Sequence, residues 1–253
     1  MALVHLVFQG KGGVGKSLVA SFLAQYILDS LKDESRLLAI DADPVNSSFA
    51  NFSRFHAHTI DLLSGDALDI SGINRMIDVV LGHSGDVVID IGPGLFIPLG
   101  NHLAESSVLS LLESRGWSVM IHSVIVGGPA QRDTLEGLAQ TIRSLPHAAR
   151  IVVWLNEYFG LIVGPEGQSF KDMRVYTANM HRFAGIVHLP KQAVNTFGTD
   201  LRQMLEKRQT FAEALADGKV GLMPRHRLTM MRRELYQHLD NIIPAGQLMD
   251  RDG

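Results

Sequence analysis

Short apolar runs alternate along this chain with longer segments in which apolar residues return every three or four positions. The runs are continuous rather than interrupted by alternating polar residues, which is typical of parallel strands that helices cover on both faces. The runs predicted as strands are Leu3–Phe8, Arg36–Ile40, Asp86–Asp90, Ser118–Val124, Ile151–Leu155 and Gly185–Leu189.

The segments between the apolar runs predict helices. One apolar stripe at helical spacing is formed by Leu18, Phe22, Leu23, Tyr26, Ile27 and Leu31. Similar patterns occur over residues 130–144, 198–208, 210–216 and 225–240. Strands that alternate with helices predict an α/β fold, a doubly wound and mostly parallel sheet with helices on both faces. Neither a repeat nor a linker is present, so a single domain over residues 1–253 is expected.

The amino-acid composition excludes several classes of function but adds little to the predicted fold. The chain has 253 residues and no cysteine, which excludes disulfides, thiol catalysis and cysteine-based zinc sites. A formal net charge of -3 gives no overall basic excess that would attract nucleic acid or anionic lipid. No run of about 18 uncharged apolar residues occurs, and no basic segment precedes the first apolar run. We therefore expect a cytoplasmic globular protein whose function depends on local motifs.

The strongest motif is a phosphate-binding loop between the first predicted strand and the first predicted helix. Its sequence satisfies the pattern G-x-x-x-x-G-K-[ST]. Glycines let successive backbone N–H groups point at phosphate oxygens, and the helix that follows adds its positive N-terminal end. The lysine is expected to reach the β- and γ-phosphates, and the serine hydroxyl to ligate Mg²⁺. The predicted nucleotide-contacting residues are Gly10, Lys11, Gly12, Gly13, Val14, Gly15, Lys16, Ser17 and Leu18.

The same glycines also match a competing motif. Gly10, Gly12 and Gly15 fit the G-x-G-x-x-G fingerprint of dinucleotide-binding folds, which shares the strand–loop–helix setting. That fingerprint does not require a Lys-Ser pair after its last glycine. It also expects an acidic residue about 20 positions on, whereas Asp41 comes 26 positions after Gly15. These differences favour phosphate binding by the loop over NAD-type binding.

Lys11 adds a second lysine inside the loop. The order Lys-Gly-Gly-Val-Gly-Lys-Ser resembles the deviant Walker A motif of the MinD/ParA class of ATPases. This resemblance implies ATP and ADP as ligands together with Mg²⁺. It also implies that Lys11 reaches the nucleotide of a second subunit, so that active sites form in an ATP-dependent homodimer. A cation placed there would offset charge that develops during phosphoryl transfer. The alternative is a solvated loop lysine.

Two aspartates end the second predicted strand, in the order Asp41-Ala42-Asp43-Pro44. The resemblance implies that Asp43 orients the attacking water and that Asp41 lies in the outer shell of Mg²⁺. The alternative is an ordinary turn after a strand, because Asp and Pro both favour turns. Partition proteins of the class usually continue with Gln-Gly-Asn, whereas this chain has valine at position 45, followed by Asn-Ser.

The apolar run over residues 86–90 ends in Asp90 and has the Walker B form. Asp90 is expected to hold a water on Mg²⁺ opposite Ser17. Gly92-Pro93-Gly94 resembles the switch II turn of the class, in which the N–H of Gly94 would contact the γ-phosphate. The class more often has proline or alanine where Gly92 stands. A buried or capping aspartate is the alternative for Asp90.

Asn156 follows the strand predicted over residues 151–155. In the class that this chain resembles, an asparagine at this place hydrogen-bonds adenine, and backbone beside a later Leu-Pro step packs on the base. Leu189-Pro190 supplies such a step, which assigns Pro190 to the nucleotide site. Turn chemistry is the alternative for Asn156. The glycine-containing stretch 159–167 is predicted to be a surface excursion.

The last predicted helix carries a basic excess, a local charge of +2 between residues 224 and 243. Its arginines are Arg225, Arg227, Arg232 and Arg233. They form either the solvated flank of a docked helix or a surface for non-specific DNA contact, as in ATP-bound partition proteins. The C-terminal end, 248–253, is acidic and barely amphipathic, unlike the membrane-targeting tail of MinD, so no membrane partner is expected.

Several segments together resemble the TraL conjugal transfer proteins of broad-host-range plasmids. They are Gln9 before the loop, 43–46, 153–156, 176–179 and 211–216. The resemblance implies a slow ATPase switch that acts in conjugative plasmid transfer and has a protein partner in the conjugation machinery. A ParA-like partition or positioning protein with ATP-dependent DNA binding is the alternative. A kinase or synthetase with the same loop is a third possibility.

Overall fold

In a computed structural model, residues 2–31, 34–43, 45–65, 67–146, 149–193 and 195–243 are described. Seven strands form one sheet in the order β3-β2-β6-β1-β7-β8-β9, and all of its pairings are parallel. Its strands are β1 (Ala2–Val7), β2 (Leu37–Ala42), β3 (His58–Thr59), β6 (Asp86–Ile91), β7 (Trp117–Val126), β8 (Arg150–Asn156) and β9 (Phe183–Leu189). A separate antiparallel pair consists of β4 (Leu63–Ser64) and β5 (Ala67–Leu68).

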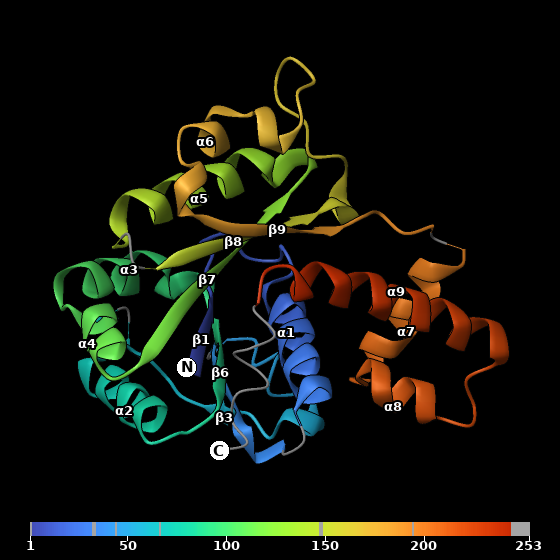
Figure 1. The fold of residues 1–253 in the computed structure, drawn as a ribbon, viewed down its shortest axis with the longest axis horizontal. Coiled ribbons are helices and arrows are strands. Elements are labelled where there is room, and N and C mark those ends of the chain that lie inside the picture. Colours follow the sequence, from blue (N-terminus) through green and yellow to red (C-terminus); the bar gives the residue numbers. More distant parts are fainter. Residues whose placement is uncertain are drawn as a thin grey trace.

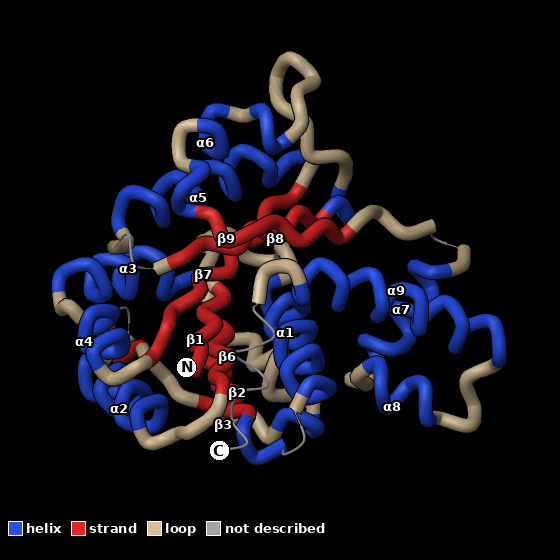
Figure 2. Tube along the Cα trace, viewed as in Figure 1, coloured by secondary structure: helices blue, strands red, loops and turns tan. Residues whose placement is uncertain are grey.

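Helices cover both faces of the sheet (Figures 1 and 2). They are α1 (Lys16–Ser30), α2 (Ile70–Leu81), α3 (Phe96–Glu105), α4 (Val108–Ser114), α5 (Gln131–Ser144), α6 (Arg174–Thr177), α7 (Phe197–Glu206), α8 (Phe211–Ala216) and α9 (Leu222–Asp240). One core lies between the sheet and α2 to α5, and the other between the sheet and α1 with α7 to α9. This arrangement confirms the predicted doubly wound α/β fold.

The continuous apolar runs reflect burial on both faces of the central strands. All six residues of β6 are buried, and so are five of the six in β1. Successive side chains of a strand point to opposite faces. In β1, Val4 and Leu6 therefore enter the core beside α2 and α4, whereas Leu3 and Val7 pack beneath α1.

The structure corrects the amphipathic interpretation of α1. Instead of a single apolar stripe, every residue from Val19 to Leu28 is buried. The C-terminal helices cover its outer side: the Phe22 ring stacks on Phe211 at 5.7 Å, and the hydroxyl of Tyr26 donates to Asp240 at 2.9 Å. A helix covered on all sides places the phosphate loop on a rigid support.

Three helices between β5 and β7 were not predicted. α2 does carry sequence signals, because Ile73, Met76 and Val80 share its buried side and Asp69 caps it by accepting a hydrogen bond from Ser71 N–H. α3 contains Pro98 and Gly100, which mask the helical pattern. Proline is tolerated there because it lies in the first turn of the helix.

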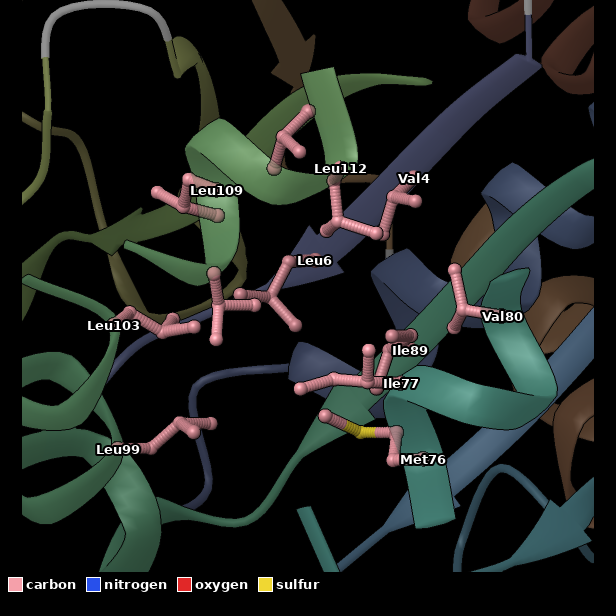
Figure 3. A pocket seen from close by; sticks show the side chains of 12 residues that line it. Val4, Leu6, Met76, Ile77, Val80, Ile89, Leu99, Leu103, Leu109 and Leu112 are labelled. Carbon is pink, nitrogen blue, oxygen red and sulfur yellow. The ribbon is translucent and has the colours of Figure 1, made fainter. Parts of the chain in front are cut away.

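A small apolar cavity of about 40 Å³ remains in the core beside α2, α3 and α4. Figure 3 shows Val4, Leu6, Ile89, Leu103 and Leu109 among its lining side chains, which come from both the sheet and the helices. In the described part of the chain, no helix is both long and apolar enough to span a membrane.

Candidate functional site

The residues singled out by the motifs gather at one edge of the sheet, where the parallel strands end. This edge carries the phosphate loop (residues 10–17), Asp41, Asp43, Asp90, Asn156 and Pro190. Asp41 and Asp90 are register partners on neighbouring strands, and Asp90 also pairs with Val7, close to the start of the loop. Open α/β sheets bind ligands at this carboxyl edge.

The backbone of the phosphate loop depends on its glycines. Gly13 and Gly15 have φ angles of 73° and 99°, in the left-handed region that other residues rarely adopt. A Cβ at Gly10 would lie 2.7 Å from the Phe96 ring, so the first loop position also requires glycine. α1 begins at Lys16 without a side-chain cap, which leaves the N-terminal end of the helix available to an anion.

Lys16 lies inside the loop rather than in solvent. It is 6% exposed, and its Nζ donates a hydrogen bond to the carbonyl oxygen of Lys11 at 3.2 Å. Burial lowers the pKa of Lys16, while Asp90 and Asp43 act in the opposite direction. Lys16 is thus the cation that faces these two carboxylates.

Asp90 is the most unusual carboxylate of this edge. It is 1% exposed, and neither of its oxygens has a hydrogen-bond partner of good geometry among the described residues. Burial raises the pKa of Asp90 to about 7, although the nearby Ser17 hydroxyl and the Lys16 ammonium lower it. A buried carboxylate without partners is costly, so this group is suited to a cationic ligand.

The donors around Asp90 fit Mg²⁺, which prefers oxygen ligands and is usually held by one or two carboxylates with phosphates and waters. Ser17 and Asp90 would hold the ion, with Asp41 behind them. The described residues contain no cluster of three or more histidine, aspartate or glutamate side chains arranged as a complete metal cage. A phosphate-bound ion does not need such a cage.

Asp41 has partners that Asp90 lacks. Its two oxygens accept hydrogen bonds from the N–H groups of Asp43 at 3.0 Å and Ala50 at 2.8 Å. Burial raises the pKa of Asp41, and these backbone N–H groups oppose the shift. Asp41 therefore fixes the turn that leaves β2, in addition to facing the predicted metal site.

Asp43 is buried and takes part in turn chemistry. Its Oδ1 accepts hydrogen bonds from the N–H groups of Val45 and Asn46, and its Oδ2 accepts one from the Asn46 amide at 3.0 Å. A Cβ at Gly92 would lie 3.2 Å from Asp43, which explains the glycine at this place in the chain. Pro44, between Asp43 and this turn, lies outside the described residues.

The segment that resembles switch II approaches the phosphate loop. A Cβ at Gly12 would lie 3.8 Å from Pro93, and Gly94 has open space around it. The structure thus brings Gly94 to the same edge as the loop, while its predicted phosphate contact stays a prediction.

Lys11 has a partner that the motif did not predict. Its Nζ lies 2.7 Å from Oδ2 of Asp133, in the first turn of α5, and both side chains are nearly half exposed. Nothing in the sequence around position 133 indicated this contact. Lys11 is therefore paired within its own chain and stays partly exposed to solvent.

Gln9 fastens the start of the loop to the same helix. Its Oε1 accepts from Gly10 N–H at 2.8 Å, and its Nε2 donates to the carbonyls of Val124 and Thr134, each at 3.1 Å. A Cβ at Gly137 would lie 2.2 Å from Gln9 Oε1, so glycine makes room for this amide. A glycine inside a helical pattern was the one sequence signal of this contact.

Asn156 connects the phosphate loop to the end of β8. Its Nδ2 donates to the carbonyl of Val14 at 3.0 Å, and its Oδ1 accepts from Tyr158 N–H at 3.2 Å. Both Asn156 and Pro190 line a cavity of about 790 Å³ that begins at Gly13 and Gly15 and extends between α1, α7 and α9. The amide retains one unused N–H for a ligand.

The arginines of α9 mostly contact their own chain. Arg225 donates to the carbonyl of Asp217, Arg227 forms an ion pair with Asp200, and Arg232 lies 3.6 Å from Asp29. Arg233 is exposed and has no such partner among the described residues. These contacts favour the docked-helix interpretation for three arginines. The acidic end of the chain, residues 248–253, lies outside the described residues.

A parallel doubly wound sheet, a two-lysine phosphate loop after its first strand and aspartates at the neighbouring strand ends together define a class. This is the MinD/ParA class of P-loop proteins. Comparison with curated proteins then gives the family.

Two proteins from Escherichia coli, each named Protein TraL, are similar to this chain over nearly its full length. One is 40% identical over 240 residues, which cover 95% of this chain and 98% of that protein. The other is 37% identical over 241 residues, with the same coverage. The chain belongs to the TraL family, which confirms the resemblance seen in its sequence.

Solved structures are more distant. A nucleotide-binding protein from Archaeoglobus fulgidus in complex with ADP is 18% identical, with a TM-score of 0.41 over 81% of this chain and 86% of that chain. A plasmid partition protein from Borrelia burgdorferi is 17% identical, with a TM-score of 0.40 over 82% and 96%. Similarities at this level carry no functional argument. No protein-family model matches the chain.

Proposed function

We propose that this protein is an ATP-binding, slowly ATP-hydrolysing switch that dimerises around nucleotide and acts in conjugative plasmid transfer. The observation that carries the proposal is Asp90, a buried carboxylate beside Lys16 and Ser17 of a phosphate loop, whose oxygens have no hydrogen-bond partner of good geometry among the described residues. Membership of the TraL family supports the role in conjugation.

Each group has a part in this proposal. Backbone N–H groups of the loop and Lys16 bind the phosphates, and Ser17 and Asp90 hold Mg²⁺ with Asp41 behind them. When bound, Mg²⁺ supplies positive charge that offsets the charge of the β- and γ-phosphates. Asp43 orients the attacking water, for which one of its oxygens must exchange its contact with the turn over residues 45–46.

Lys11 supplies the link to assembly. Both side chains of the Lys11–Asp133 ion pair are nearly half exposed. Lys11 can therefore leave Asp133 at little cost and bind a nucleotide phosphate on a second subunit. Hydrolysis then waits for two subunits to meet, which makes turnover slow and makes the dimer the output of the switch.

Nucleotide binding and hydrolysis test the proposal with two variants. We expect the unaltered chain to bind ATP with Mg²⁺ in calorimetry and to release phosphate slowly. Lys16→Ala should abolish binding because it removes the buried cation of the loop, whereas Asp43→Ala should keep binding and lose hydrolysis. ATP binding that is indifferent to Lys16→Ala would contradict the proposed site.

DNA binding by a partition-type protein remains the alternative. It predicts ATP-dependent, salt-sensitive binding of duplex DNA through α9. Because three arginines of α9 already contact their own chain, Arg233→Ala is the sharpest variant for this alternative. DNA binding that is equal with and without nucleotide would reject it.

A further inference from the structure

An exposed aromatic residue stands at the mouth of the cavity that begins at the phosphate loop. Tyr158 is 71% exposed, and it lines this cavity together with Gly13, Gly15 and Pro190. Large aromatic side chains contribute most when they are covered. A tyrosine left open beside a phosphate loop therefore has the position of a ligand-contacting group.

The backbone of Tyr158 is tied to the phosphate loop through Asn156. The Tyr158 N–H donates to Asn156 Oδ1 at 3.2 Å, and Asn156 Nδ2 donates to the Val14 carbonyl at 3.0 Å. The side-chain amide of Asn156 thus connects the phosphate loop to the backbone of Tyr158. These two hydrogen bonds fix where the backbone of Tyr158 lies relative to the phosphate loop.

The turn that carries Tyr158 is held from its other side as well. A Cβ at Gly127 would lie 2.2 Å from the Gly160 carbonyl oxygen, so these two backbones are in direct contact. Gln131 Nε2 donates to the Val163 carbonyl at 2.6 Å. The Tyr158 ring itself packs edge-on against Phe159, with centroids 5.0 Å apart and an angle of 86°. The aromatic pair is therefore preorganised.

We propose that Tyr158 is the stacking platform for the base of the bound nucleotide, and that Asn156 positions this platform relative to the phosphate loop. This inference rests on the proposed nucleotide site and adds the group that recognises the flat face of the base. Stacking of a base on an aromatic side chain corresponds to roughly 5- to 150-fold in affinity. Phosphates alone would gain nothing from it.

The chemistry of the platform separates it from a protein-docking surface. Leu161 is 68% exposed three residues further on, so the turn also has an apolar side away from the cavity. A partner protein would use Leu161 as readily as Tyr158. A nucleobase would contact the aromatic side that lines the cavity, Tyr158 with Phe159 beside it, and not Leu161, which does not line the cavity.

Two ligands distinguish base stacking from phosphate binding: ATP and inorganic tripolyphosphate, each titrated with Mg²⁺ by calorimetry. Tyr158→Ser should weaken ATP roughly 5- to 150-fold and leave tripolyphosphate within about twofold. Tyr158→Phe keeps the ring and should keep the affinity for ATP. Leu161→Ser is the matched control and should change neither ligand.

Asn156→Ala tests the positioning role. If Asn156 acts through Tyr158, its effect on ATP affinity should largely disappear in a Tyr158→Ser background, which is a non-additive double-mutant cycle. A Tyr158→Ser variant whose ratio of ATP to tripolyphosphate affinity is unchanged overturns the inference while the proposed nucleotide site stands. An unaltered chain that binds neither ligand overturns both.

Discussion

The two lysines of the phosphate loop occupy different environments, although they are only five positions apart in the sequence. Lys16 is buried and donates to the loop itself, whereas Lys11 is nearly half exposed and pairs with Asp133. An exposed ion pair contributes only about 0–1 kcal/mol. The pair therefore holds Lys11 in place without locking it, which suits a group proposed to act in a second subunit.

Removing Asp133 should release Lys11. We expect Asp133→Ala to change the free energy of unfolding by less than about 1 kcal/mol and to promote ATP-dependent assembly at lower protein concentration, because Lys11 loses its competing partner. Sedimentation velocity over a concentration series with ATP measures the shift. Glu136→Ala breaks the exposed pair with Arg132 on the same helix and serves as the control. Equal assembly by both variants would contradict the role given to Asp133.

Motifs written in consecutive residues could be predicted from the sequence, but contacts between distant segments could not. The loop over residues 10–17 could be recognised from the spacing of its glycines, lysine and serine. The contacts of Gln9 and Lys11 with Thr134 and Asp133 depend instead on how α5, which packs against β7, places its first turn beside the phosphate loop. No local pattern encodes that packing.

At the scale of elements, a polar chain of side chains crosses three strands beneath α1. Trp154 on β8 donates to His122 Nδ1 at 2.9 Å, and His122 Nε2 lies 3.0 Å from His5 Nδ1 on β1. Because the indole N–H is only a donor, neutral His122 carries its proton on Nε2 and donates it to His5. This row of hydrogen-bonded side chains therefore requires both histidines to be uncharged.

This requirement predicts a loss of stability in mild acid. Burial lowers the pKa of His5 to about 4, against the opposing charge of Asp86, and burial also lowers the pKa of His122 well below 6.5. The unfolded state then binds more protons, so stability is full above pH 6.5 and falls as the pH drops toward 4. His5 alone accounts for about 3 kcal/mol over this window.

Urea unfolding at a series of pH values between 7.5 and 5 measures this loss. A chain with both His5→Leu and His122→Leu lacks the titrating groups, so its free energy of unfolding should fall less steeply below pH 6.5. Its stability at pH 7.5 should be lower than that of the unaltered chain because Trp154 loses its acceptor. Equal slopes for the two chains would show that the histidines are not the cause.

Strands were easier to predict than helices. Burial on both faces makes the central strands continuous apolar runs, and their predicted ranges agree with β1, β2, β6, β7, β8 and β9 within two residues at each end. The unpredicted α3 carries proline and glycine inside a helix, and the interpretation of α1 failed because α8 and α9 cover its outer side. Coverage of one helix by distant helices depends on tertiary packing, which the local pattern of apolar residues does not reveal.

At the scale of the whole molecule, space left inside one core predicts how single core positions respond to a larger side chain. The core beside α2 to α4 contains the cavity of about 40 Å³ shown in Figure 3, lined by Val4. We expect Val4→Ile to raise the free energy of unfolding by about 0.5–1 kcal/mol in urea, because one methylene fills part of this space. Val152, in the other core, lines neither this cavity nor the larger one at the phosphate loop, so Val152→Ile should destabilise by about 1–3 kcal/mol. Equal effects of the two substitutions would show that the cavity does not decide the response of Val4.

Several of the exposed large apolar residues follow strands that end at the same edge as the nucleotide motifs. Val45 follows β2, and Tyr158, Phe159 and Leu161 follow β8. Exposed apolar residues that gather into one patch mark interaction sites on proteins. A carboxyl edge that combines a phosphate loop, an exchangeable Lys11 and exposed apolar groups is consistent with assembly across that edge.

The mass of the Asp43→Ala variant in solution tests the central claim most directly. Without hydrolysis, ATP and Mg²⁺ should hold this variant as a dimer of the 27.8 kDa chain, whereas ADP should leave it monomeric. Adding Lys11→Ala should return the ATP-bound form to a monomer. A monomer with saturating ATP, or a dimer that forms equally well with ADP, would contradict the nucleotide-dependent switch.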